Sequence, residues 1–173
     1  MAALLASLSS LTWGVSDFVG GMTTRRARVL VVVLWSQLVG LCVAFVGAPL
    51  FEGSLTPDAM LWGAPAGIAG GVGLLALYQG LASGRAAIVA PVAAVVGAGL
   101  PVVFGIGSGE RPGTTAALGI AVALPALWLV SRTRSGESTE GFAAGVLAGA
   151  GFGSFFVFLA QTPGDSGLWS LVP

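Results

Sequence analysis

The charged residues of this chain are few and widely spaced, and the intervals between them are long and apolar. Five intervals without a charged residue hold at least 20 residues each and cover residues 29–51, 59–84, 86–109, 112–131 and 141–164. A helix needs about 20 consecutive apolar residues to cross the hydrocarbon core of a bilayer. The sequence therefore predicts a chain that crosses a membrane several times.

A sixth apolar segment, residues 2–22, precedes these five. It lacks the basic start of a cleaved signal peptide, so we expect it to remain as a helix. The chain is 55% hydrophobic and 8% charged, with a mean hydropathy of +0.96, which leaves too little hydrophilic surface to cover a soluble core. Continuous apolar blocks also argue against the alternating strands of a β-barrel. We expect an all-α polytopic transmembrane helix bundle of about six helices, with the lipid bilayer as its surroundings.

The charge balance and the missing residue types exclude several function classes. The seven basic and seven acidic residues cancel, so there is no basic surface for nucleic acid. The chain has no histidine and a single cysteine, Cys42. No disulfide, no histidine metal site and no histidine-activated nucleophile can form within it. We therefore expect no enzyme activity, no metal and no cofactor.

The polar segment 132–141 is interpreted as a linker between two units. Residues 1–131 form the first unit, and residues 142–173 begin a second. Trp13-Gly14 aligns with Phe152-Gly153, a faint internal repeat with an offset of 139 residues. With five helices in the first unit, a second copy would be inserted in the opposite orientation, as in many secondary transporters. The alternative is chance similarity between two glycine-rich apolar helices.

Two apolar segments carry glycines at four-residue spacing, which places them along one face of a helix. Such strips let a second helix approach closely in a membrane, so we expect both to pack against other helices. The six glycines are Gly63, Gly67, Gly71, Gly145, Gly149 and Gly153. The same strips leave a second function open, that of a non-transporting helix bundle that scaffolds or forms a homodimer.

Three motifs together carry a family resemblance that follows the chain in order. They are "LTWGVSDFVGG" at residues 11–21, "LYQGLASGRAAIVAPVAAVVGAGLPVV" at 77–103 and "GERPG" at 109–113. The chain resembles the first repeat of an EamA-type transporter of the drug/metabolite transporter superfamily. The resemblance implies ten helices in two inverted five-helix repeats, multi-pass insertion in the plasma membrane and alternating-access transport of a small organic solute, with a coupling proton as a possible partner.

Against that family pattern, the sequence carries one repeat and the first helix of the next. The cavity of such carriers forms between the repeats. We therefore expect residues 1–173 alone not to transport, and an inactive fragment is the second alternative to a transporter.

The candidate solute-binding residues are polar and aromatic side chains within the predicted spans. Such polar groups are costly in lipid and usually face a bundle interior. The candidates are Trp13, Ser16, Asp17, Trp35, Gln37, Tyr78 and Gln79. Asp17 would take up a proton or pair with a cationic group of the solute. The alternative is that the helix breaks at Gly20-Gly21 and leaves Asp17 at the headgroups, with Tyr78 and Gln79 also interfacial.

Two arguments about orientation disagree. The loops after the first, third and fifth spans hold six of the seven arginines, which places the amino terminus outside by the positive-inside rule. The family resemblance implies a cytoplasmic amino terminus. Both orientations stay open at this stage.

Overall fold

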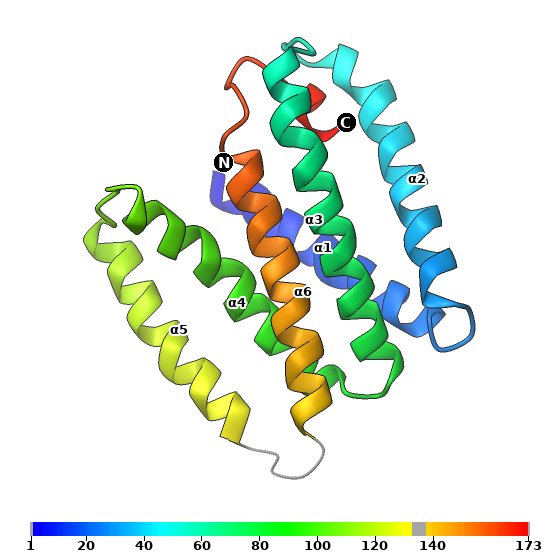
Figure 1. Ribbon diagram of the computed structural model, residues 1–173, viewed down its shortest axis with the longest axis vertical. Helices are drawn as coiled ribbons and strands as arrows, with labels where there is room; N and C mark the ends of the chain where they lie inside the picture. Colours follow the sequence, from blue (N-terminus) through cyan, green and yellow to red (C-terminus); the bar gives the residue numbers. More distant parts are fainter. Residues whose placement is uncertain (1, 133–137, 173) are drawn as a thin grey trace.

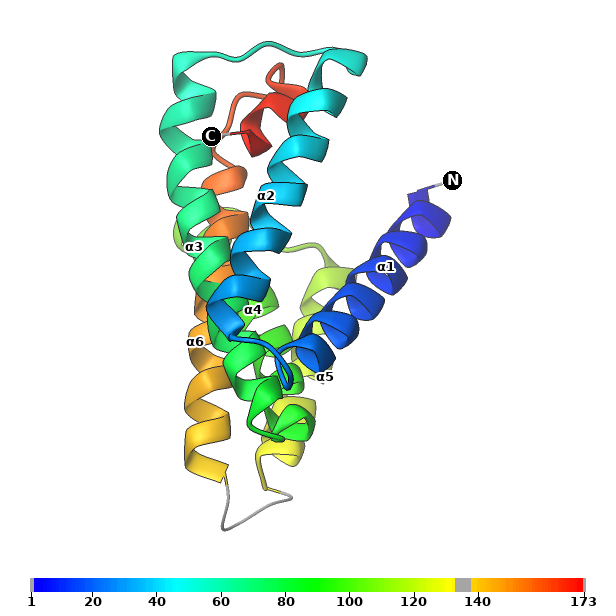
Figure 2. The same cartoon turned by 90° about the vertical axis from the view of Figure 1, so that its right-hand side faces the viewer.

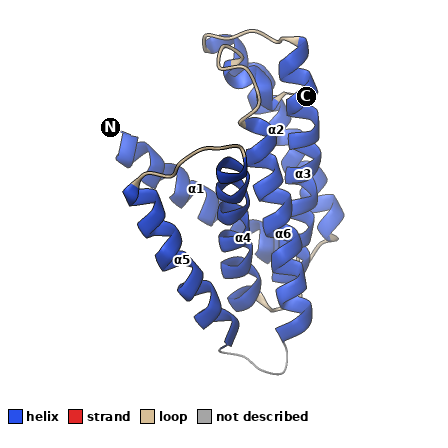
Figure 3. Ribbon diagram, turned by 60° about the vertical axis from the view of Figure 1, so that its left-hand side comes forward, coloured by secondary structure: helices blue, strands red, loops and turns tan. Residues whose placement is uncertain are grey.

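The computed structural model describes residues 2–132 and 138–172, and within them all regular structure is helical (Figure 3). The six α-helices are α1 (Ala2–Thr23), α2 (Val29–Gly47), α3 (Pro57–Ala82), α4 (Ala86–Gly107), α5 (Thr114–Arg132) and α6 (Ser138–Leu159). Two short 3-10 helices, η1 (Ala48–Leu50) and η2 (Gly167–Leu171), complete the described structure. The predicted all-α bundle of about six helices is confirmed.

Four stretches of this bundle are long and apolar enough to cross a membrane. They are Val29–Leu50, Pro57–Ala82, Ala86–Gly107 and Thr139–Leu159. In α5, a shorter apolar stretch, Thr114–Ala123, is found among the described residues. α1 is not among the four, and its several serines together with Asp17 lower its hydropathy. The chain is a multi-pass membrane protein by these spans.

α6 occupies the middle of the bundle, in contact with both α3 and α4 (Figure 1). α5 lies on the outer side of α4, and α2 lies along α3. α1 leans away from the other helices, with its first residues far from them (Figure 2). α6 begins at Ser138, inside the segment assigned to the linker, while residues 133–137 lie outside the described residues. Glu140 in its first turn suits the positive end of the helix dipole.

The contact between α4 and α6 is made by glycines of α6. A Cβ on Gly145 would lie 3.0 Å from the carbonyl oxygen of Val89, and one on Gly149 would lie 2.8 Å from that of Ala93. A Cβ on Gly153 would lie 2.7 Å from Cβ of Leu100. All three glycines are buried. The strip therefore lets α4 approach so closely that its backbone carbonyls and the Cβ atoms of Val92, Val96 and Leu100 lie against α6.

α3 meets α6 through a different set of glycines from the predicted strip. A Cβ on Gly151 would lie 2.6 Å from Cα of Gly73, so backbone touches backbone here as well. Gly71 instead faces α2, where the Gln37 amide nitrogen would lie 3.8 Å from its Cβ. The other two glycines of the predicted α3 strip are Gly63, which is buried, and Gly67, which is half-buried.

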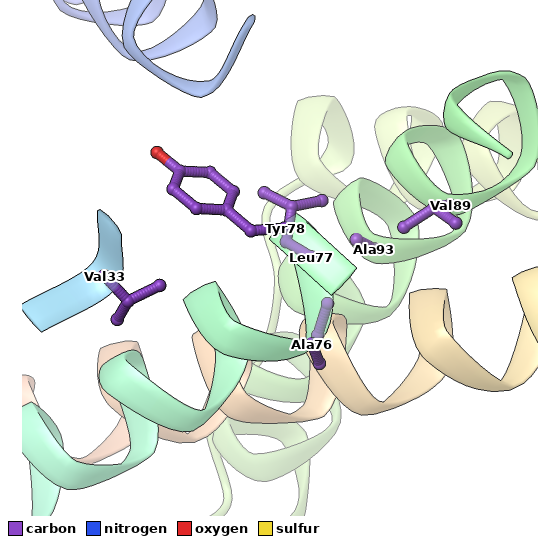
Figure 4. Packing of buried hydrophobic residues seen from close by; sticks show 7 residues of the cluster. Val33, Ala76, Leu77, Tyr78, Val89 and Ala93 are labelled. Atoms are coloured by element: carbon purple, nitrogen blue, oxygen red, sulfur yellow. The ribbon is translucent and has the colours of Figure 1, made fainter. Parts of the chain in front are cut away.

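Tyr78 of α3 connects α1 with the buried centre of the bundle. This side chain is 3% exposed and belongs to a buried cluster with Val33 of α2, Val89 and Ala93 of α4, and Ala148 of α6 (Figure 4). Its ring and hydroxyl also press against Gly20 of α1, where a Cβ would clash with them. Tyr78 therefore joins α1 to the buried cluster.

The segment after α6 folds back onto the loop between α2 and α3. The amide of Ser54 donates a hydrogen bond to the carbonyl oxygen of Asp165 at 3.2 Å. The ring of Trp169 meets Phe45 of α2 edge-on at 6.4 Å. Gly53 and Gly167 have positive φ angles of 152° and 54°, and a Cβ on either would clash with the opposite backbone. We name residues 51–56 with 162–171 the loop clasp, which holds η2, the segment that follows α6, against α2 and α3.

Candidate functional site

A cavity of about 550 Å³ lies between α1 and the face formed by α3, α4 and α6. Its α1 wall is built from residues on one side of the helix: Trp13, Gly14, Asp17, Phe18, Gly21 and Met22, with Arg25 just beyond the helix end. Trp13, Asp17, Gly21 and Arg25 follow at intervals of four, which brings them to one helical face. α3 adds Leu77 and Leu81.

Small residues of α4 give the cavity its room. The α4 wall consists of Ala86, Ala90, Ala93, Ala94, Gly97 and Ala98. Side chains of this size leave space between helices that leucine or phenylalanine would fill. α4 also passes through Pro91 and Pro101 without ending. Each proline lacks the amide that would pair with a carbonyl one turn earlier.

The α6 wall is aromatic. Phe152, Phe155 and Phe156 line the cavity, and the last two rings meet edge-on at 5.2 Å. Trp13 and Phe152, which align in the predicted repeat, thus line one cavity from two helices. Aromatic walls suit a solute with an apolar body.

Asp17 and Arg25 are the charged groups among the described residues that line the cavity. α1 continues through Gly20 and Gly21 to Thr23, so Asp17 lies six residues inside the helix end. The predicted alternative of a break at these glycines is therefore wrong; the glycines allow Tyr78 and Leu81 to approach instead. Asp17 is half-buried and forms no ion pair within the described part of the chain, where the one ion pair joins Arg85 to Glu140.

A comparison with known protein families finds that residues 1–132 match the EamA-like transporter family. The chain belongs to the EamA-like transporter family. The resemblance seen in the three motifs is thereby confirmed, and with it the absence of an enzyme class, since the family is one of transporters. No curated protein and no solved structure gives a significant match to the chain.

The structure of this EamA-like protein brings two of the predicted site residues to the cavity, Trp13 and Asp17. Tyr78 lies beneath α1 and supports it, without lining the cavity. The other four, Ser16, Trp35, Gln37 and Gln79, are exposed and lie away from the cavity. The presence of a polar residue within a span does not indicate whether its side of the helix faces the cavity. That depends on how the neighbouring helices pack.

Sequence reasoning missed Arg25 and the three phenylalanines of α6 as cavity residues of the EamA-like protein. The four-residue ladder from Trp13 through Asp17 and Gly21 points to Arg25, and it was available from the sequence. The phenylalanines carry no such signal, because phenylalanine is as common on lipid-facing surfaces as in cavities.

Proposed function

We propose that this EamA-like protein moves a small organic solute across the plasma membrane by alternating access, and that the solute binds between α1 and the α3–α4–α6 face. The observation that carries the proposal is the cavity, whose volume of about 550 Å³ lies within the range of small-molecule sites. Apolar walls with two charged groups suit an amphipathic solute.

The position of α6 supports an alternating-access mechanism. α6 follows the polar segment after the first five helices, yet it supplies the aromatic wall of the cavity. In carriers with repeats, one repeat rocks against the other around a site at their interface. A solute held between Asp17 and the phenylalanines would contact both units at once, so its binding would depend on their relative position.

The scaffold alternative is less well supported by the packing. The α6 glycine strip already holds α4, because a Cβ on Gly145 or Gly149 would lie 3.0 Å or 2.8 Å from a carbonyl oxygen of α4. A partner helix could use this strip only by displacing α4. The strip therefore serves the interior of this chain.

The test is a solute-uptake screen in proteoliposomes that contain the purified protein. We compare wild type with Ala94→Trp, which fills the cavity from α4, and with Val103→Trp, a matched change on the same helix at a side chain that is 71% exposed. Ala94→Trp should reduce uptake at least tenfold, and Val103→Trp should leave it unchanged. Equal uptake by all three proteins would sink the proposed site.

A further inference from the structure

We propose that the cavity selects an organic ammonium ion, whose charge binds at Asp17 and whose apolar body lies against Phe152, Phe155 and Phe156. This inference rests on the proposed function, since it names the class of solute that the same cavity takes. Four features support it: the location of Asp17, the aromatic wall, the position of Arg25 and the lack of other charged groups in the lining.

Asp17 is a carboxylate held in the cavity wall with no ion-pair partner among the described residues. It is half-buried on α1, with Trp13 one turn earlier and Phe18 next to it, and all three line the cavity. The ion pair of the described residues, Arg85–Glu140 at 2.8 Å, joins the starts of α4 and α6 and does not include it. A carboxylate in apolar surroundings gains most from a cation brought to it by the ligand.

The opposite wall offers what an ammonium ion binds in addition to a carboxylate. An aromatic face attracts a cation through its quadrupole, and the attraction is larger where water is displaced. Phe155 and Phe156 follow Phe152 on α6 by three and four residues, and all three line the cavity. Trp13 adds an aromatic side chain to the α1 wall of the same cavity.

Arg25 is the charge that opposes this choice, and its position weakens the opposition. It lies eight residues after Asp17, beyond the end of α1 at Thr23, and is exposed. The six helical residues from Asp17 to the end of α1 correspond to about 9 Å along the axis, and Arg25 lies two residues beyond that end. Water screens an exposed guanidinium at that distance far more than it screens a contact inside the cavity. The remaining described lining residues of α3, α4 and α6 are uncharged, so Asp17 sets the charge preference of the interior.

The experiment measures binding to residues 1–173 in phosphatidylcholine nanodiscs by isothermal titration calorimetry. Three water-soluble probes share a benzyl group and differ in charge: benzyltrimethylammonium, benzyl methyl sulfone and phenylmethanesulfonate. We expect the cation to bind at least tenfold more tightly than the neutral sulfone and the anion. Equal affinities for the three probes in the wild type would overturn the inference.

Variants then assign the preference to the named groups. Asp17→Asn, a change that nearly preserves size, should lower the affinity for the cation about tenfold and leave the affinity for the sulfone unchanged. Asp58→Asn, at an exposed carboxylate outside the cavity, should change neither. Phe156→Leu should lower the affinity for the cation about threefold. Because Phe156 is 48% exposed, this change tests the aromatic wall without destabilising the fold. A cation preference that survives in both Asp17→Asn and Phe156→Leu would overturn the inference.

The result is separable from the fate of the proposed function. A preference for the sulfonate that disappears in Arg25→Gln would reassign the cavity to anions and overturn the ammonium inference. The proposed transport site would still stand if Ala94→Trp blocks uptake. Uptake that Ala94→Trp leaves unchanged removes the transport site itself, whatever the probes show.

Discussion

α1 and α6 are the two helices that the predicted internal repeat aligns, yet the structure holds them in opposite ways. Gly153 of α6 sits against Leu100, whereas nothing lies within 4 Å of a Cβ on Gly14, its counterpart in α1. Large apolar side chains along α1, from Leu4 to Met22, are between 53% and 68% exposed. α6 is enclosed by α3 and α4, whereas the close contacts of α1 among the described residues lie near its end, at Gly20 and Gly21.

The difference shows that small and apolar residues permit close packing without choosing a partner. Both helices are about equally long and rich in small residues. What distinguishes α6 is that its glycines meet backbone on two sides: a Cβ on Gly151 would lie 2.6 Å from Cα of Gly73 in α3, and one on Gly149 would lie 2.8 Å from the carbonyl oxygen of Ala93 in α4. Where no such face is opposite, the same kind of helix leaves a cavity beside it, and in this protein that cavity is the candidate site.

The largest expected effect tests this contrast directly. Gly149→Leu places a side chain where the carbonyl oxygen of Ala93 would be 2.8 Å from its Cβ. Because backbone cannot move aside without separating α4 from α6, we expect a loss of about 3 kcal/mol or more and little folded protein. Gly14→Leu, in open space, should leave the folded yield unchanged.

Thermal unfolding followed by size-exclusion chromatography in detergent checks both glycine variants. The contrast between the helices fails if Gly149→Leu and Gly14→Leu melt at the same temperature. It is sharpened if Gly151→Leu, which would meet Gly73, behaves like Gly149→Leu.

The attachment of α1 provides the second prediction. Gly20→Ala forces the Tyr78 ring away from α1, and we expect it to cost about 1–2 kcal/mol. Tyr78→Leu replaces the ring by a shorter side chain. In the double variant with Gly20→Ala, it should therefore recover part of the lost stability. A double-variant cycle with a coupling of about 0.5 kcal/mol or more would show the contact. Strict additivity of the two changes would instead mean that α1 is held elsewhere.

The loop clasp gives a smaller effect at the far end of α6. Trp169→Leu removes the edge-on contact with Phe45 while keeping an apolar side chain. Aromatic pairs contribute about 0.5–1.5 kcal/mol beyond the area they bury, so we expect a loss of about 1 kcal/mol. The matched change Trp35→Leu, at a side chain that is 65% exposed, should cost less. Equal melting temperatures for the two variants would show that the clasp does not stabilise the protein.

The smallest effect is expected at the other end of α6. Arg85 and Glu140 form an ion pair at 2.8 Å, with side chains 33% and 79% exposed. Exposed pairs contribute about 0–1 kcal/mol, and salt screens them. Glu140→Gln should therefore lower stability by no more than about 0.5 kcal/mol at low salt and not at all at about 0.5 M salt. A loss that persists at high salt would indicate a packing role for Glu140.

Much of the helix pattern is predictable from the spacing of charges. The interval 86–109 became α4 (Ala86–Gly107), and 59–84 became α3 (Pro57–Ala82), with Thr56 capping the start through a 3.1 Å hydrogen bond from the Ala59 amide. These boundaries follow because a charge or a cap ends each apolar run. The central position of α6 did not follow, because glycine spacing does not identify the partner helix.

The candidate site was predictable in part for a similar reason. Asp17 and Trp13 could be found because a carboxylate inside an apolar helix needs a polar or protein surrounding, and Trp13 is one turn away. Gln79 is polar and adjacent to Tyr78 but points outward, because successive residues of a helix face directions about 100° apart. The alanines of α4 could not be recognised as cavity residues, since alanine in an apolar helix gives no sequence signal that distinguishes a cavity wall from a packed interface.

The central place of α6 also sets the order of events during synthesis. Gly73 meets Gly151, so the inner faces of α3 and α4 stay uncovered until the ribosome has made nearly the whole segment through α6. Contacts between residues so distant in sequence form late, and the surfaces that wait for them are open to wrong partners. Before α6 is made, lipid or the insertion machinery covers the inner faces of α3 and α4. α6 must then displace it. A chain whose synthesis ended before α6 would have inserted helices but would lack the helix that packs between α3 and α4.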